Sequence, residues 1–89
     1  MKYSVLLSGK ARKNLKKLDK TVSSMLIAWI RKNLHGTENP RAFGKKLTAN
    51  FGGLWRYRVG DYRIIAEILD EIITILVLEI GHRREIYDR

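Results

Sequence analysis

The stretch LWRYRVGDYRIIAEI, residues 54–68, decides the fold. Apolar and polar side chains alternate on both sides of Gly60-Asp61, which is typical of two strands joined by a two-residue hairpin turn. A turn of this length places Arg58 directly opposite Arg63. Because side chains alternate between the two faces of a strand, the hairpin has an apolar face and a basic face. The predicted core face carries Trp55, Tyr57, Val59, Tyr62, Ile64 and Ala66, and the other face carries Arg56, Arg58 and Arg63.

Three arginines on one sheet face, with one carboxylate, Glu67, nearby, require an explanation. Like charges placed directly opposite each other in a sheet lower stability by roughly 0.2–1 kcal/mol. A bound phosphate compensates for this repulsion, because guanidinium groups bind phosphate oxygens through paired, charge-assisted hydrogen bonds. The alternative is a solvated face on which each arginine points outward. For three converging arginines we favour an anion site.

A strand and two amphipathic helices are predicted upstream of this hairpin. Residues 3–7 form the strand, and Ser8-Gly9 ends it. Apolar residues then recur at helical spacing in two stretches, which are separated near Asp19 and end at Gly36. The two apolar stripes consist of Ala11, Leu15 and Leu18, and of Val22, Met25, Leu26, Trp29, Ile30 and Leu34.

The last predicted strand, residues 72–80, is apolar on both faces, which is typical of a central strand. A turn at Asp70-Glu71 precedes it, and the basic stretch between residues 37 and 53 is expected to be irregular. The order is therefore strand, helix, helix, strand, strand, strand (β-α-α-β-β-β). It predicts an α+β fold with a four-stranded, mainly antiparallel sheet and a helical hairpin on one face. A chain of 89 residues is expected to form one domain, residues 1–89.

Positive charge is the strongest signal in the composition. The 18 Lys and Arg residues against 9 Asp and Glu give a net charge of +9. The excess is uneven, because residues 1–63 hold 15 basic and 3 acidic residues, whereas residues 64–81 hold 4 acidic residues and no basic ones. Such a surface favours a polyanion as partner, since it binds phosphates and releases their counterions.

The composition also excludes several classes of site. There is no cysteine, which excludes disulfides, a thiol nucleophile and a thiolate metal site. His35 and His82 are far apart in sequence, so neither a metal nor another cofactor is predicted. His35, at the end of the second helix, is interpreted as a partner of the helix dipole. No apolar run approaches the roughly 18 residues of a membrane helix, so we expect a soluble cytoplasmic protein.

A second basic cluster follows the last strand, in the sequence GHRREIY at residues 81–87. His82, Arg83 and Tyr87 are residue types that a metal-free ribonuclease needs. One group removes the 2′-hydroxyl proton, another protonates the leaving 5′-oxygen, and cations stabilise the phosphorane. Taken singly, His82 is equally well read as an ordinary exposed histidine and Tyr87 as an anchor of the C-terminus.

These segments resemble the RelE family of ribosome-dependent messenger-RNA interferases. The resemblance rests on residues 54–68 and on the apolar strand that ends in GHRREIY, and KKL at residues 45–47 also matches the family pattern. It spans nearly the whole chain. The resemblance implies a toxin that cuts messenger RNA in the ribosomal A site by 2′-hydroxyl attack and that an antitoxin inhibits. A toxin–antitoxin hetero-oligomer is therefore expected, with an acidic antitoxin.

The resemblance also implies roles for individual residues. The catalytic set becomes Arg56, Arg58, Arg63, His82, Arg83 and Tyr87, and the predicted RNA-binding residues are Lys45, Lys46, Arg41 and Arg84. One departure matters, because many members carry lysines at the positions of Arg56 and Arg58. An arginine is too basic to serve readily as a general base, which leaves His82 and Tyr87 as the candidates for that role.

Two other functions are compatible with the sequence. ParE-type toxins share the fold and poison DNA gyrase without cutting RNA, but they generally lack the combination of basic residues, histidine and tyrosine. A non-catalytic nucleic-acid-binding module needs only the positive charge. Cleavage of messenger RNA on an assembled ribosome, or inhibition of supercoiling, distinguishes the three.

Overall fold

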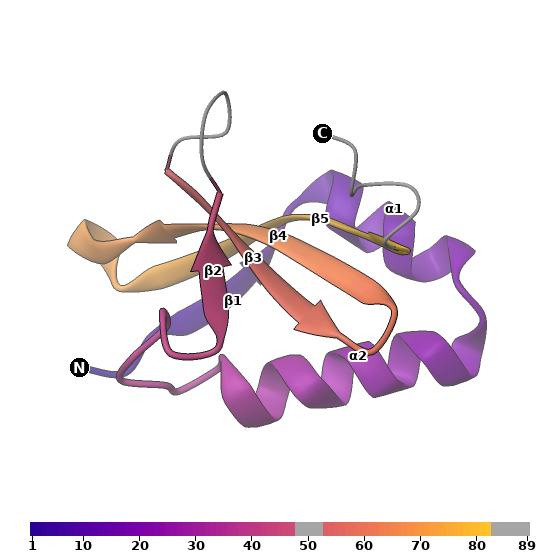
Figure 1. The fold of residues 1–89 in the computed structure, drawn as a ribbon, viewed down its shortest axis with the longest axis horizontal. Coiled ribbons are helices and arrows are strands. Elements are labelled where there is room, and N and C mark those ends of the chain that lie inside the picture. Colours follow the sequence, from indigo (N-terminus) through magenta and orange to yellow (C-terminus); the bar gives the residue numbers. More distant parts are fainter. Residues whose placement is uncertain (48–52, 83–89) are drawn as a thin grey trace.

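Five strands and two α-helices follow one another in the computed structural model, which describes residues 1–47 and 53–82 (Figure 1). The sheet has the order β1-β5-β4-β3-β2, in which β1 pairs with β5 in parallel and all other pairs are antiparallel. The strands are β1 (Ser4–Leu7), β2 (Gly44–Lys46), β3 (Leu54–Val59), β4 (Tyr62–Leu69) and β5 (Thr74–His82), and the helices are α1 (Gly9–Lys17) and α2 (Lys20–Asn33).

The predicted α+β class is confirmed, and the strand count is corrected from four to five. The additional strand, β2, lies within the stretch that was expected to be irregular. It is only three residues long and pairs with β3 at the sheet edge. A run this short carries too little alternation to be recognised from sequence.

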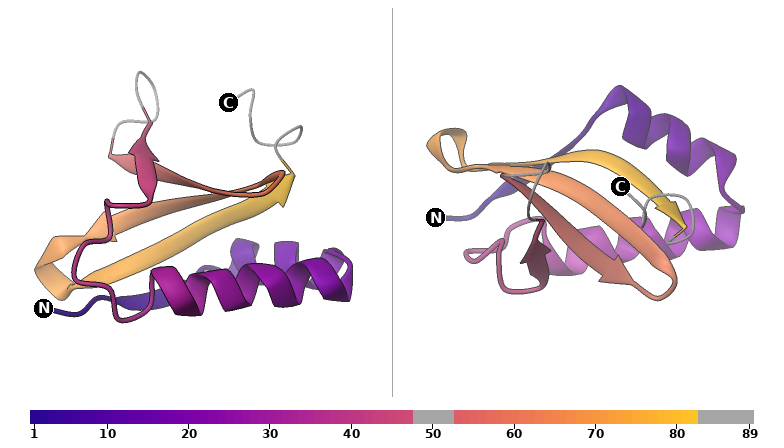
Figure 2. Two further views of the ribbon diagram at one scale, coloured as in Figure 1. Left: turned by 60° about the horizontal axis from the view of Figure 1, so that its bottom comes forward. Right: turned by 45° about the horizontal axis from the view of Figure 1, so that its top comes forward.

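Both helices lie on one face of the sheet (Figure 2). Their apolar stripes and the apolar face of the sheet form the core, in which Leu26, Tyr57 and Ile64 are completely buried. The predicted stripes are confirmed at Ala11 and Leu15, but Met25 is 43% exposed. Ile27, two residues further along α2, packs against the core instead. No helix in the described part of the chain is long and apolar enough to cross a membrane.

The register of the β3–β4 hairpin is as predicted. Val59 pairs with Tyr62 and Arg58 pairs with Arg63 across the Gly60-Asp61 turn. Gly60 has a φ of 59°, a backbone conformation that glycine adopts without a steric penalty. The turn therefore fixes which side chains share a face.

Strand β5 is central, as its apolar sequence predicted, but it begins and ends later than expected. Residues Asp70–Ile72 form a turn of 3-10 helix, so the strand starts at Thr74 and continues through His82. Its pairing with β4 shifts register between Ile65 and Ala66. This irregularity leaves Leu78 without an opposite residue, as in a β-bulge.

Helix α1 covers the edge of β5 beyond the end of β1. The Ser8 hydroxyl caps the helix by accepting from the Ala11 N–H, and it donates to the Leu78 carbonyl at 2.8 Å. The Asn14 side-chain oxygen accepts a hydrogen bond from the Ile80 N–H at 3.0 Å. The helix thus satisfies strand groups that a neighbouring strand otherwise pairs with.

Candidate functional site

The sheet face that points away from the helices carries the three arginines, and we call it the arginine face. Arg56 pairs with Ile65, and Arg58 pairs with Arg63, so all three side chains leave the sheet on the same side. Their environments differ. Arg58 is exposed, Arg56 is half-buried, and Arg63 is only 3% exposed. The hairpin therefore presents two accessible arginines, Arg56 and Arg58, and a buried one, Arg63.

Strand β2 adds a fourth cation to this face. Lys45 pairs with Arg56, so both side chains leave the sheet on the same side. A cavity of about 140 Å³ lies beside them and is lined by Phe43, Lys45, Arg56 and Arg58. We call it the cationic cavity. Three positive side chains around one small cavity favour an anionic group such as a phosphate.

Close packing between β2 and Tyr57 holds Lys45 in place. A Cβ added to Gly44 would lie 2.8 Å from Tyr57 Cε1, so only glycine lets the strand approach the ring this closely. The Tyr57 hydroxyl donates a hydrogen bond to the Pro40 carbonyl at 2.5 Å. Burial raises the pKa of Tyr57 to about 12, so the phenol remains a hydrogen-bond donor well into the alkaline range.

Two predicted RNA-binding residues lie elsewhere. Lys46 pairs with Trp55, so the alternation of the strand places it on the helix side of the sheet. Arg41 forms a two-point ion pair with Asp70, with nitrogen–oxygen distances of 2.7 and 3.3 Å, and its guanidinium lies 5.6 Å from the centre of the Trp55 ring. The structure therefore does not bring Arg41 or Lys46 together with the three arginines, and their RNA-binding role stays a prediction.

Asp70 ties the arginine at residue 41 to the first residues of the chain. The Tyr3 hydroxyl donates to the same carboxylate at 2.5 Å. The hydrogen bonds from Arg41 and then from Tyr3 lower the pKa of Asp70, because they favour its charged form. Arg41 thus holds the loop before β2 against the turn after β4, a structural role that its basic side chain does not reveal in the sequence.

His82 lies at the end of β5, on the other face of the sheet from the arginines. Its backbone pairs with Tyr62, and its ring lies edge-on to the Tyr62 ring at a centroid distance of 5.4 Å. Tyr62 packs against the core, so the ladder places His82 on the helix side, away from Arg58 and Arg63. The β5 residue that pairs with Arg63 is Gly81, which contributes no side chain to the arginine face. The other three predicted tail residues, Arg83, Arg84 and Tyr87, lie outside the described residues.

Sequence reasoning missed two residues near this site. Glu79 pairs with Ile65 on the arginine face, is 8% exposed and lies 3.6 Å from the Lys10 amine, so Glu67 is not the one carboxylate there. The alternation of β5 could have revealed it, because residues two apart in a strand, such as Glu79 and Gly81, lie on the same face. Phe43 lines the cationic cavity, but its position in an apparently irregular stretch gave no signal. Residues 1–47 and 53–82 contain no group of three or more His, Cys, Asp or Glu side chains able to hold a metal ion.

Comparison with known proteins identifies the family. The model for the ParE toxin of type II toxin-antitoxin systems (parDE) matches residues 5–87. Toxin RelG from Mycobacterium tuberculosis is 32% identical over 89 residues, which is 100% of both chains.

Solved structures agree with this assignment. A chain of the toxin-antitoxin complex RelBE2 from Mycobacterium tuberculosis has a TM-score of 0.85 at 29% identity, covering 93% of this chain and 100% of that chain. A mutant of E. coli toxin RelE in the free state shares the fold, with a TM-score of 0.75 at 24% identity over 98% of this chain and 90% of that chain. The chain therefore belongs to the ParE toxin family and is a RelE-type toxin of a type II toxin–antitoxin system.

Proposed function

We propose that this toxin is a ribosome-dependent endoribonuclease that cuts messenger RNA and so inhibits translation. The observation that carries the proposal is the cationic cavity, in which Lys45, Arg56 and Arg58 from two paired strands surround a space suited to one phosphate. Its relatives RelG and RelE are toxins by name, which supports a toxic activity for the same fold. We place this activity in the cytoplasm, where ribosomes and messenger RNA are available.

The proposed reaction is attack of a ribose 2′-oxygen on the neighbouring phosphorus. The 2′-oxygen loses its proton and forms a bond to phosphorus, and the bond to the 5′-oxygen breaks as that oxygen takes up a proton. The products are a 2′,3′-cyclic phosphate and a 5′-hydroxyl. Arg56 and Arg58 bind the non-bridging oxygens and stabilise the charge that develops on the phosphorane.

The general acid is assigned by position and the general base by elimination. Lys45 lines the cationic cavity, and its ammonium group is a proton donor for the leaving 5′-oxygen. Of the two residues that the sequence offers as a general base, His82 lies on the helix side of the sheet, so the proposal assigns the base to Tyr87. Arg83 and Arg84 keep the phosphate-binding roles that the family resemblance implies.

The direct test is single-turnover cleavage of messenger RNA on assembled ribosomes. Wild-type toxin is expected to cut within the A-site codon and leave a cyclic phosphate. Lys45→Arg keeps the charge but donates a proton poorly, so it should bind ribosomes normally and cleave about 100- to 10,000-fold more slowly. Equal cleavage by wild type and Lys45→Arg would remove Lys45 from the chemistry.

We further propose that catalysis needs no metal. Cations that already surround the phosphate repel a divalent ion and replace its electrostatic role. Cleavage should therefore persist when transition metals are chelated while magnesium is held fixed to preserve the ribosome. Restoration of a chelated reaction by added zinc or manganese would contradict this.

We also propose that a cognate acidic antitoxin neutralises the toxin in a hetero-oligomer. Several of the structural relatives come from toxin–antitoxin complexes, among them RelBE2 and the archaeal RelE-RelB complex from Pyrococcus horikoshii. The net charge of +9 favours an acidic partner, because opposite potentials speed and orient association. Pull-down of the protein encoded beside the toxin gene, followed by loss of cleavage on its addition, tests this.

A second function, poisoning of DNA gyrase, is favoured by the family model, which is named for ParE toxins. A supercoiling assay separates the two. Inhibition of supercoiling without messenger-RNA cleavage supports the gyrase poison, and neither activity supports a non-catalytic nucleic-acid-binding module.

A further inference from the structure

Phe43 is a large apolar side chain that the fold leaves in solvent. It is 55% exposed and lines the cationic cavity together with Lys45, Arg56 and Arg58. Of the exposed large apolar side chains in residues 1–47 and 53–82, it alone is aromatic. An exposed ring beside three cations differs from an ordinary surface residue, because it joins a flat apolar surface to a phosphate-binding site.

We infer that Phe43 is a stacking platform for a nucleobase of single-stranded RNA, and that it forms one nucleotide subsite with the cationic cavity. The inference rests on the proposed function for the identity of the ligand. Single-stranded nucleic acids are bound by basic grooves interleaved with aromatic rings, because each nucleotide has both a phosphate and a flat base. The subsite supplies both contacts within one cavity wall.

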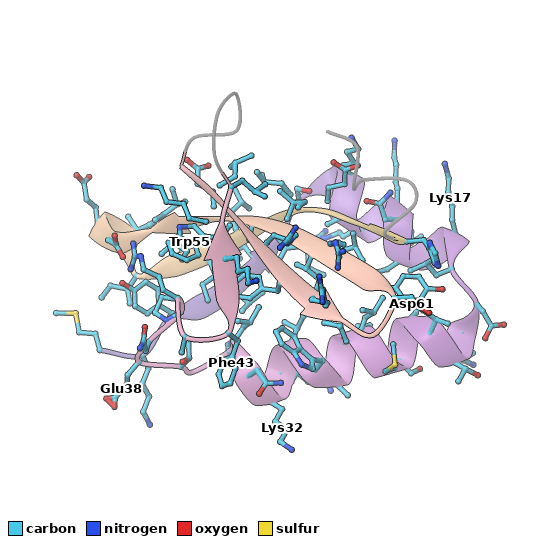
Figure 3. All side chains as sticks on the ribbon, in the orientation of Figure 1. Lys17, Lys32, Glu38, Phe43, Trp55 and Asp61 are labelled. Atoms are coloured by element: carbon cyan, nitrogen blue, oxygen red, sulfur yellow. The ribbon has the colours of Figure 1, made fainter. Side chains whose placement is uncertain are left out.

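The orientation of the Phe43 ring is restrained by its contact with Trp29. Its centroid lies 6.4 Å from that of Trp29, and the two ring planes meet at 78°. The centroid of the Trp29 ring in turn lies 5.9 Å from that of Tyr57, which is completely buried. Figure 3 shows Phe43 beside α2 at the start of β2. A ring held against the core and still largely exposed loses little freedom when a base stacks on it.

The cations argue for RNA as the occupant over an apolar segment of a protein. An apolar anchor of a partner protein is buried in a well-packed, desolvated pocket, whereas the walls beside Phe43 are the charged side chains of Lys45, Arg56 and Arg58. Burying those charges against apolar groups is costly. A nucleotide matches both parts of the wall, because its phosphate suits the three cations and its base suits the ring of Phe43.

The test measures binding of six-nucleotide RNAs with 2′-O-methyl riboses, which 2′-hydroxyl attack cannot cut, by fluorescence anisotropy at low salt. In each oligonucleotide one nucleotide lacks its base. Wild-type toxin should lose affinity about 5- to 100-fold at one abasic position. Phe43→Ala should bind the intact RNA with that weaker affinity and show no further loss at the same position, while Phe43→Trp should keep the wild-type pattern.

Two controls separate stacking from other effects. Leu6→Ala removes an apolar side chain of equal exposure, 55%, from the opposite edge of the sheet and should leave binding unchanged. Arg58→Ala should weaken binding to every oligonucleotide by a similar factor, because a phosphate contact does not depend on the base. Thermal unfolding of Phe43→Ala checks that the fold persists.

The outcomes distinguish this inference from the proposed function. If wild type cleaves messenger RNA on ribosomes but Phe43→Ala and the abasic substitution act additively at every position, the inference fails and the proposed function stands. Coupled loss at one position without any cleavage supports the subsite and contradicts the endoribonuclease. Phe43→Ala binding RNA as wild type does but binding the antitoxin more weakly overturns the inference in favour of a protein contact.

Discussion

Arg58 and Arg63 face each other across the hairpin, yet they have opposite environments. Arg58 is exposed, whereas Arg63 is 3% exposed. An exposed arginine contributes mainly charge, while a buried one also contributes the packing of its long aliphatic stem. The sequence treats the two residues as equivalent, and the structure separates their effects on folding.

We therefore predict different consequences for the two alanine variants. Arg58→Ala should change the free energy of unfolding by less than about 0.5 kcal/mol, since it removes an exposed side chain and relieves a like-charge pair. Arg63→Ala should lower it by about 1–3 kcal/mol. Arg58→Ala should also slow cleavage about 100- to 1,000-fold, as expected for loss of a group that stabilises a transition state. Urea unfolding and single-turnover cleavage measure the two effects, and equal stability of the variants would contradict the assignment.

Tyr57 predicts a specific loss of stability in alkali. Burial raises its pKa from 10 to about 12 in the folded protein, so folding favours the protonated phenol. The stability that this preference provides is complete below pH 10 and is lost as the pH rises from 10 to 12. Tyr57→Phe should be less stable at neutral pH by about 1 kcal/mol, because the bond to Pro40 is gone. Its urea midpoint should then fall less than that of wild type as the pH rises from 10 to about 12.

At the scale of elements, β2 can pair closely with β3 because residue 44 is a glycine and has no side chain. Gly44 lies against the ring of Tyr57, and the next residue, Lys45, reaches the cationic cavity. The ring cannot easily move, because its hydroxyl is bonded to Pro40 and the side chain is completely buried. The placement of a candidate catalytic lysine therefore depends on a neighbouring glycine.

Gly44→Ala should consequently damage both stability and activity. A Cβ 2.8 Å from Tyr57 must displace β2 or the ring, at a cost of about 1–3 kcal/mol for overpacking. Gly9→Ala is the matched control, because a Cβ at Gly9 meets nothing within 4 Å. Chemical denaturation and cleavage assays of both variants are the measurements. A Gly44→Ala protein as stable and active as Gly9→Ala would show that the close approach is not required.

Local patterns and long-range contacts differ in how far they could be predicted. The hairpin register and the grouping of Arg56, Arg58 and Arg63 followed from a two-residue turn and strict alternation. The role of Arg41 did not, because Asp70 is 29 residues away. The face occupied by His82 depends on where β5 begins and on the register shift near Ile65, and neither has a local signal.

At the scale of the whole molecule, the charge of +9 creates a long-range field. We predict that this field accelerates capture of the proposed acidic antitoxin. Adding salt so that the Debye length falls from about 10 Å to about 3 Å should slow association far more than it speeds dissociation. Stopped-flow mixing across a salt series measures both rates.

A single exposed lysine provides the control for this effect. Lys13→Gln on α1 should weaken the salt dependence of association slightly without changing dissociation, because it alters the field and no candidate site residue. Association that is insensitive to salt would show that the contact is chiefly apolar.

The parallel pairing of β1 with β5 joins residues 4–7 to residues 74–77. During synthesis the first of these segments emerges from the ribosome well before the second. The sheet therefore cannot acquire its central strand while most of the chain is still being made. A nascent chain thus cannot complete its sheet until residues 74–77 have emerged from the ribosome.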